Sequence, residues 1–248
     1  MSKVGSSSVA KSLKASKELA VFQVHNLRSS DIDASLRSHV HKTQRVYSKV
    51  IWESIYLNKR LTQNKGPEPW HVITLIREPI ARNVSSYFQN IELWCPEICE
   101  AGLSESEKLE KATVAFFDKF PHDLTSRWLD NKLRPVIDID VYKKPFPVDK
   151  GYEIYESKRF RLLLIRLESL KDCYAPAFQA FLGISDIPLL SGNIGEEKRY
   201  AELYRNFLRE TTFPPSYIES MYSSKYMRHF YTNEEIAAYR KRWCTKNC

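Results

Sequence analysis

The chain has 248 residues, of which 43% are hydrophobic and 27% charged, which is ordinary for a globular protein with one sizeable core. Lysine and arginine outnumber aspartate and glutamate by 38 to 30, so the surface favours a polyanion: a nucleotide, an acidic polysaccharide, nucleic acid or a membrane face. No helix-turn-helix, zinc-knuckle or RNA-binding sheet signature occurs in the sequence, which argues against nucleic acid.

Hydropathy and cysteine usage indicate the compartment. No stretch approaches the ~20 apolar residues that cross a bilayer, and the start of the chain lacks the apolar centre of a signal peptide. The five cysteines form no Cys-x-x-Cys pair, so neither a zinc site nor a disulfide framework is predicted. We expect reduced thiols, no bound metal, and a cytoplasmic protein that is at most peripheral at the inner membrane surface.

Taken in chain order, short apolar runs alternate with helical patterns. Strands are predicted at 19–24, 71–76 and 161–166, and less clearly at 136–142 and 152–155. Helices are predicted at 9–17, 44–61, 105–119, 121–131, 170–182, 196–210, 214–223 and 234–243, and another begins at Pro79. This alternation predicts one α/β domain with a mostly parallel sheet that helices cover on both faces.

The first candidate site is Lys3-Val4-Gly5-Ser6-Ser7-Ser8, which opens a predicted helix. Glycine lets the backbone approach a ligand closely, and the N–H groups at a helix N-terminus bind anions. A serine-rich helix start can equally be an ordinary N-cap. The segment does not match Gly-x4-Gly-Lys-Ser/Thr, and no Mg²⁺-holding carboxylate strand is evident, which argues against ATP or GTP hydrolysis.

The second candidate site follows the strand at 71–76. Arg77 stands at the carboxyl end of that strand, Pro79 starts the next helix, and Ser85 lies about two turns into it. Arginine recognises phosphate with two parallel hydrogen bonds. The alternative is that Arg77 and Glu78 only cap and pair at a strand–helix turn.

Together the two segments resemble the sulfotransferase family, with its 5′-phosphosulfate loop (Lys-x-Gly-x-Ser/Thr) and its 3′-phosphate motif (Arg-Asp/Glu-Pro-x-x-Arg-x-x-Ser). A third match is Arg166-Leu167-Glu168-Ser169-Leu170 ahead of Phe181-Leu182-Gly183, although Ser169 replaces the family's usual Asp. The resemblance implies a three-layer fold like that of P-loop NTPases, of the sulfotransferase type, and 3′-phosphoadenosine-5′-phosphosulfate (PAPS) as the sulfuryl donor, with no metal.

Later segments narrow the resemblance. Ser126-Arg127-Trp128-Leu129-Asp130, Pro145-Phe146-Pro147, Lys150-Gly151-Tyr152 and His229-Phe230-Tyr231 occur in order. They are similar to a sulfotransferase-like group of capsular polysaccharide synthesis proteins, and the resemblance spans nearly the whole chain. It implies an enzyme that sulfates a hydroxyl of a carbohydrate or polysaccharide acceptor, in capsular or cell-surface polysaccharide synthesis.

The resemblance also implies roles for single residues. Lys3 would stabilise the charge on the leaving phosphate, and the loop residues Gly5, Ser6, Ser7 and Ser8 would bind the 5′-phosphate. Arg77 and Ser85 would bind the 3′-phosphate.

The base that takes the acceptor proton is predicted to be His25. It follows the strand at 19–24, where related carbohydrate sulfotransferases place a His or Glu, and histidine titrates near neutral pH. The alternative is a hydrogen-bonded histidine at a strand end. Arg127, Trp128 and Lys132 are weaker candidates for an acceptor groove, as is Lys225 for a nucleotide contact.

One departure from the family bears on these expectations. The phosphate loop of sulfotransferases follows a central strand, whereas only Met1 and Ser2 precede Lys3. We therefore expect residues 1–248 to form a single domain that lacks its first strand through N-terminal truncation. Two other functions stay open: an inactive nucleotide-binding or scaffold protein of polysaccharide biosynthesis, and a P-loop kinase acting on a sugar.

Overall fold

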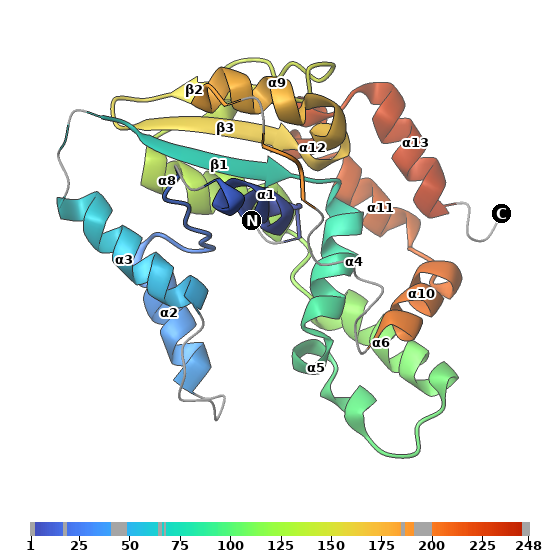
Figure 1. Ribbon diagram of the computed structural model, residues 1–248. Coiled ribbons are helices and arrows are strands. Elements are labelled where there is room, and N and C mark those ends of the chain that lie inside the picture. Colours follow the sequence, from blue (N-terminus) through green and yellow to red (C-terminus); the bar gives the residue numbers. More distant parts are fainter. Residues whose placement is uncertain are drawn as a thin grey trace. The chain divides into compact units, whose positions relative to one another are not determined.

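A computed structural model describes residues 3–16, 19–40, 49–63, 66, 68–184, 187–190 and 200–244. It is a mixed α/β structure, mostly helical, with a small three-stranded sheet (Figure 1). The chain divides into two compact units: unit 1 is residues 1–76 with 127–192, and unit 2 is residues 77–126 with 193–248. A single sulfotransferase-like domain over residues 1–248 stays a prediction.

Unit 1 contains the sheet and several helices. Its elements are α1 (Ser6–Ala15), α2 (Ser29–Val40), α3 (Lys49–Gln63), β1 (Trp70–Ile76), the π-helical turn η2 (Leu129–Leu133), α8 (Arg134–Ile137), the 3₁₀ turn η3 (Val141–Lys143), β2 (Tyr152–Glu156), β3 (Phe160–Arg166), the 3₁₀ turn η4 (Leu167–Ser169) and α9 (Leu170–Leu182). The short helix α7 (Leu124–Trp128) spans the boundary between the units.

The sheet has the strand order β1-β3-β2, in which β1 pairs parallel with β3 and β2 pairs antiparallel with β3. The sheet is therefore mixed, and the expectation of a mostly parallel sheet is wrong for these strands. The Trp70 N–H donates to the Arg159 carbonyl at 2.8 Å. Because backbone groups alternate in direction along a strand, those of His71, Ile73 and Leu75 point to the opposite edge of β1.

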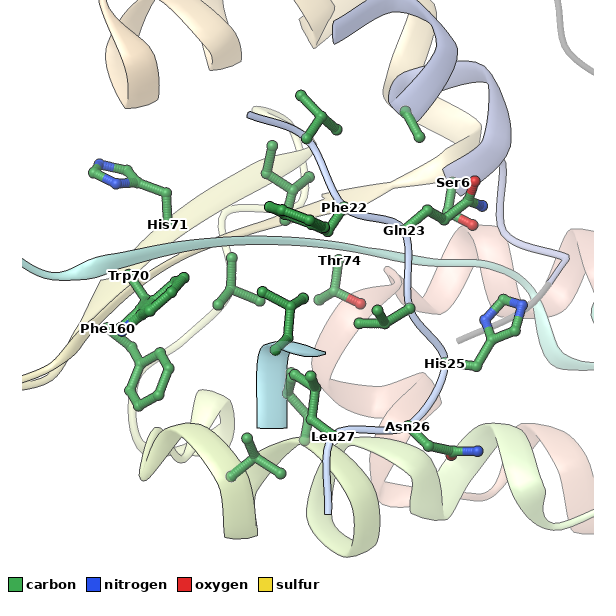
Figure 2. Close-up of a pocket in the computed structure, with 18 of the residues that line it drawn as sticks. Ser6, Phe22, Gln23, His25, Asn26, Leu27, Trp70, His71, Thr74 and Phe160 are labelled. Atoms are coloured by element: carbon green, nitrogen blue, oxygen red, sulfur yellow. The ribbon is translucent and has the colours of Figure 1, made fainter. Parts of the chain in front are cut away.

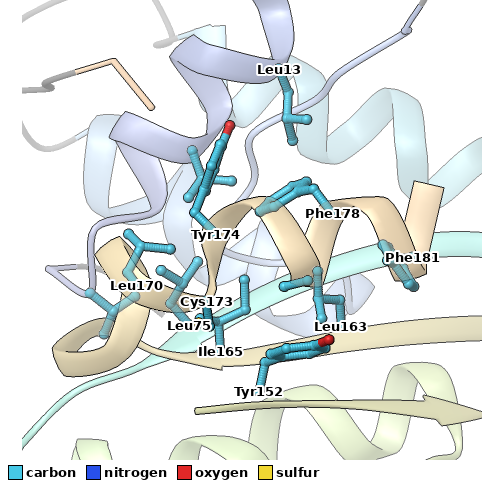
Figure 3. Close-up of a cluster of buried hydrophobic side chains, with 13 residues drawn as sticks. Leu13, Leu75, Tyr152, Leu163, Ile165, Leu170, Cys173, Tyr174, Phe178 and Phe181 are labelled. Carbon is cyan, nitrogen blue, oxygen red and sulfur yellow. The ribbon is translucent and has the colours of Figure 1, made fainter. Parts of the chain in front are cut away.

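The core of unit 1 lies between the sheet, α1 and α9 (Figure 3). The central strand supplies Leu162, Leu163, Leu164 and Ile165, all with 0% exposure, which means that both faces of β3 are covered. On one face of the sheet, Leu163 and Ile165 pack with Leu13 of α1 and with Tyr174 and Phe178 of α9. Leu75 of β1 and Tyr152 of β2 belong to the same cluster. Helix α9 ends at Gly183, whose φ of 73° fits a left-handed C-cap.

The sequence predicts the buried strands and most helices of unit 1, and two predicted strands are wrong. Strands at 71–76, 152–155 and 161–166 and the helix at 170–182 are confirmed. Residues 19–24 form no strand, and the Gln23 N–H donates to the Glu53 carboxylate at 2.8 Å. The strand predicted at 136–142 is wrong. Helix α8, which starts at Arg134 with Pro135 in its first turn and ends at the left-handed C-cap Asp138, occupies this run together with η3.

Unit 2 is helical. It contains α4 (Pro79–Gln89), α5 (Ile91–Trp94), η1 (Pro96–Cys99), α6 (Glu105–Lys119), α10 (Ala201–Glu210), α11 (Pro215–Tyr222), α12 (Lys225–Phe230) and α13 (Asn233–Cys244). Its core is aromatic: the ring of Tyr87 packs on Phe116 and Phe207, and its hydroxyl donates to the Ala112 carbonyl at 2.8 Å. This contact ties α4 to α6.

Two further features are absent from the described part of the chain. None of the helices described is both long and apolar enough to cross a membrane. Nor do three or more His, Cys, Asp or Glu side chains gather there in a way that could hold a metal ion.

Candidate functional site

The N-terminal loop contains two residues with left-handed backbone conformations. Lys3 and Gly5 both adopt left-handed conformations, with φ of 63° and 82°, and the intervening Val4 is fully buried. A left-handed conformation is uncommon for a lysine and is kept only where the surroundings enforce it. Such turns bring successive N–H groups together into a concave surface that suits an oxyanion.

Gly5 is needed for close packing as well as for its backbone angle. A Cβ at this position would lie 2.6 Å from Leu167 Cδ1 and 3.7 Å from Leu75 Cδ2. Leu75 is near the end of β1, and Leu167 directly follows β3. The loop therefore lies at the carboxyl ends of the two parallel strands, which is where open α/β sheets bind ligands.

Helix α1 begins directly after Gly5, and no side chain caps this end. Its first turn contains no acidic residue. The partial positive charge of the helix N-terminus is therefore not neutralised by a carboxylate of this turn, and it can act on a bound phosphate.

A hydrogen-bonded chain joins this loop to the segment that contains His25. The Gln23 side chain donates to the Ser7 hydroxyl at 3.1 Å, while the Gln23 N–H donates to Glu53 of α3. Further along, the Asn58 amide of α3 donates to the Leu27 carbonyl at 2.7 Å. The segment 19–27 is thus fixed to α1 at one point and to α3 at two.

A cavity of about 510 Å³ opens in unit 1 beside β1 (Figure 2). Its walls come from both faces of β1, from α1, from segment 19–27, from α3 and from the η2–α8 region, so it wraps around the edge of β1 that lies away from β3. Most of the lining is apolar. The polar side chains that line it include Ser6, Gln23, His25, Asn26, Arg60 and Thr74.

His25 lies at the mouth of this cavity and is exposed. Surrounding protein atoms nevertheless desolvate its charged form and lower its pKa below the ordinary 6.5. The imidazole is therefore neutral at neutral pH. A neutral imidazole can accept a proton, as a general base must.

Only some of the weaker candidates for an acceptor groove line the cavity. Trp128 and Lys132 line the cavity, and Arg127 is not among its lining residues. The Lys132 ammonium group lies 2.6 Å from the Asp31 carboxylate, which also lines the cavity. Its charge is therefore balanced within the wall.

Arg77 and Ser85 belong to unit 2. The Tyr226 hydroxyl accepts from the Arg77 N–H at 3.1 Å and donates to the Arg77 carbonyl at 2.9 Å, which satisfies both backbone groups of the half-buried arginine. Ser85 is half-buried on α4. The nearby Arg82 is 5% exposed, and burial lowers its pKa to about 10.

Glu78 forms the N-cap of α4. Its carboxylate accepts from the Ile80 and Ala81 N–H groups at 2.7 and 2.8 Å and from the Tyr222 hydroxyl at 2.7 Å. The idea that Glu78 caps a strand–helix turn is confirmed. The partners Tyr222 and Tyr226 could not be found from sequence, because both lie more than a hundred residues along the chain.

The predicted site residues thus fall into two groups. Lys3, Gly5, Ser6, Ser7, Ser8 and His25 lie in unit 1, where Ser6 and His25 line one cavity. Arg77 and Ser85 lie in unit 2.

Comparison with known proteins places the chain in a family. Residues 108–232 match the family described as "Putative capsular polysaccharide synthesis protein" (NKWYS). The match covers half of the chain, and the chain therefore belongs to this family. All predicted donor-site and catalytic residues precede the matched segment. The comparison with curated proteins gives no match, and the comparison with solved structures gives none either.

Proposed function

We propose that this protein is a PAPS-dependent sulfotransferase that modifies a carbohydrate hydroxyl during capsular or cell-surface polysaccharide synthesis. The observation that carries the proposal is the cavity of unit 1, which Ser6 of the phosphate loop and His25 line together. Membership of the capsular polysaccharide synthesis family supports the choice of a carbohydrate acceptor. We also propose that the chain folds as a P-loop-like domain of the sulfotransferase type.

The donor supplies a sulfuryl group on a good leaving phosphate. In the proposed reaction, neutral His25 takes the proton of the acceptor hydroxyl while the oxygen of that hydroxyl bonds to sulfur. The bond from sulfur to the bridging oxygen breaks, and its electron pair stays with the 5′-phosphate. Lys3 and the first N–H groups of α1 stabilise the charge that develops there. The products are the sulfated sugar and the 3′,5′-bisphosphate PAP.

Donor binding is tested by calorimetric titration of the chain with PAP and, separately, with ATP. We expect a preference for PAP that is lost in Arg77→Ala, since an arginine is assigned to the 3′-phosphate that ATP lacks. Arg228→Ala is the matched control, because Arg228 lies on α12 in the same unit and contacts the Ser223 carbonyl. Equal affinity for PAP and ATP would refute the assignment.

Turnover is tested separately with labelled PAPS and a mixture of capsular oligosaccharides. We expect transfer that His25→Ala abolishes while PAP affinity is kept. PAP binding without transfer to any acceptor would favour the alternative, an inactive sulfotransferase-like scaffold of polysaccharide biosynthesis. One observation supports that alternative: Ser169, which stands where the family has Asp, packs against Gly151.

A further inference from the structure

One face of α3 carries aromatic and cationic side chains and no acid. Its exposed residues include Trp52, Tyr56, Lys59 and Arg60. Residues 52 and 56 are one turn apart, and 59 and 60 follow one turn later, so the four share a stripe along the helix. We call these four residues, together with Phe22, the α3 platform.

The aromatic members of the platform are unusually exposed. Trp52 is 57% exposed, Tyr56 50% and Phe22 41%. The rings of Phe22 and Tyr56 stack with centroids 5.5 Å apart and planes at 28°. Exposed aromatic groups that cluster, rather than scatter singly, mark binding surfaces. A stacked pair offers a flat, rigid apolar face.

The charged side chains of the platform are all positive. The sequence of α3 contains a single acid, Glu53, which is half-buried and bonded to the Gln23 N–H, with Lys14 and Lys49 at 3.8 Å. Among the described residues no ion pair involves Lys59 or Arg60. Their charges are thus available to an anionic ligand.

The platform is continuous with the candidate site. Phe22, Tyr56 and Arg60 line the same cavity as His25. Phe22 and His25 lie on one extended segment (Figure 2), and three residues of extended chain span at most about 11 Å. A short oligosaccharide that rests on the aromatic pair can therefore reach the imidazole.

We propose that the α3 platform is the acceptor subsite, and that it binds an acidic polysaccharide. The apolar C–H face of a pyranose ring stacks on Phe22, Tyr56 and Trp52, while the carboxylates of uronic acid units pair with Lys59 and Arg60. This subsite rests on the proposed function, and it specifies that the acceptor is an anionic polysaccharide. Binding of the saccharide does not itself require sulfuryl transfer.

Charge and burial favour this occupant over two others. A second copy of the chain would bring like charges face to face, since the chain carries a net charge of +8. A membrane would need the apolar face of the helix, and that face, which includes Ile51 and Leu57, is buried within the protein. A saccharide uses the exposed face.

The test is calorimetric titration of the full chain with oligogalacturonate, and with neutral dextran of the same length as the comparison ligand. We expect oligogalacturonate to bind more tightly. Trp52→Ala and Tyr56→Ala should each weaken it by about tenfold, and Lys59→Ala/Arg60→Ala should remove its preference over dextran. Leu93→Ala, which changes another exposed side chain, and Lys158→Ala are matched controls that should bind as the wild type does.

Equal losses in the platform variants and in Leu93→Ala would overturn the subsite, as would equal binding of dextran. Platform-dependent binding of vesicles with anionic lipid, without oligogalacturonate binding, would assign the face to a membrane instead. Tyr56→Phe, which keeps the ring, should retain affinity even if Tyr56→Ala unfolds. If the chain binds oligogalacturonate but not PAP, the subsite is supported and the sulfotransferase assignment is refuted. If the chain binds PAP but no saccharide, the subsite is refuted and the donor site is supported.

Discussion

The Tyr222 hydroxyl donates a hydrogen bond of 2.7 Å to the Glu78 carboxylate, which is only 2% exposed. The same carboxylate caps α4 through the Ile80 and Ala81 N–H groups. A buried carboxylate is tolerated only when its oxygens are satisfied by donors. The pair therefore stabilises the helix start that follows Arg77, and it links α11 to α4 within unit 2.

Removal of this hydroxyl should destabilise unit 2. Tyr222→Phe keeps the ring but leaves the Glu78 carboxylate one donor short, and we expect the free energy of unfolding to fall by about 1.5–3 kcal/mol. Urea unfolding followed by far-UV circular dichroism measures the change. Tyr204→Phe is the control, because the half-buried ring of Tyr204 packs on Phe88 in the same unit and no hydrogen bond from Tyr204 to Glu78 is involved. A Tyr222→Phe variant as stable as the wild type would show that this bond adds nothing to stability.

Alanine variants of two glycines with nearly the same φ distinguish the cost of backbone strain from the cost of steric overlap. Gly151 has φ 74° and Gly183 has φ 73°. A Cβ at Gly183 would meet nothing within 4 Å, whereas one at Gly151 would lie 2.3 Å from Ser169 Cβ. Gly183→Ala should cost about 1–2 kcal/mol from the left-handed conformation alone, and Gly151→Ala should cost a further ~1–3 kcal/mol from overpacking.

The double variant Gly151→Ala/Ser169→Gly tests that explanation. It removes the Ser169 side chain that the new Cβ would meet, so it should recover part of the stability lost in Gly151→Ala. Thermal unfolding of the four proteins gives the comparison. If Gly151→Ala and Gly183→Ala are equally stable, the contact with Ser169 imposes no constraint.

The sequence predicts the parts of the fold that depend on local apolar pattern. The run Leu162–Ile165 is continuous and fully buried, and it could be assigned from the sequence to a central strand. The helix at 170–182 could be assigned from its spacing and from Gly183. Segment 19–24 has an equally apolar pattern but forms no strand, because pairing depends on distant groups. Here the Glu53 side chain of α3 takes the Gln23 N–H.

The candidate site stays a prediction from residue types. The loop Lys3–Ser8 and His25 stand out in the sequence, and the structure adds the left-handed φ of Gly5 and the lowered pKa of His25. The partners of Arg77 and Glu78 on α11 and α12 could not be predicted, because two tyrosines among fourteen carry no local signal. Nor does the sequence indicate that Phe22 stacks on Tyr56, which lies on a different element.

His122 should make unit 2 less stable in acid. Its Nε2 lies 2.7 Å from the Phe116 carbonyl, which can only accept, so Nε2 carries the proton and Nδ1 accepts from the Tyr217 hydroxyl at 3.0 Å. Burial lowers the pKa of His122 below 6.5. The unfolded chain therefore binds this proton at a higher pH than the folded one, and stability falls as pH falls below 6.5.

We expect this acid sensitivity to diminish when the titratable group is removed. The loss of unfolding free energy between about pH 7.5 and about pH 5.5 should be smaller in His122→Gln than in the wild type. Both proteins keep His25 and His71, whose pKa values are also lowered, so their contribution cancels. Parallel pH profiles for the two proteins would mean that His122 takes up its proton without disturbing the fold.

The pH dependence of the proposed sulfuryl transfer tests the assignment of His25 as its base. Because the pKa of His25 is lowered, the rate should stay at its maximum at neutral pH and fall only as pH drops to a value below 6.5. His25→Gln should lower the rate by about 10²–10⁴-fold and abolish this acid limb. His71→Gln is the matched control, since His71 lines the same cavity, also has a lowered pKa and bonds instead to Arg161. If His71→Gln loses the acid limb and His25→Gln keeps it, the base has been assigned to the wrong histidine.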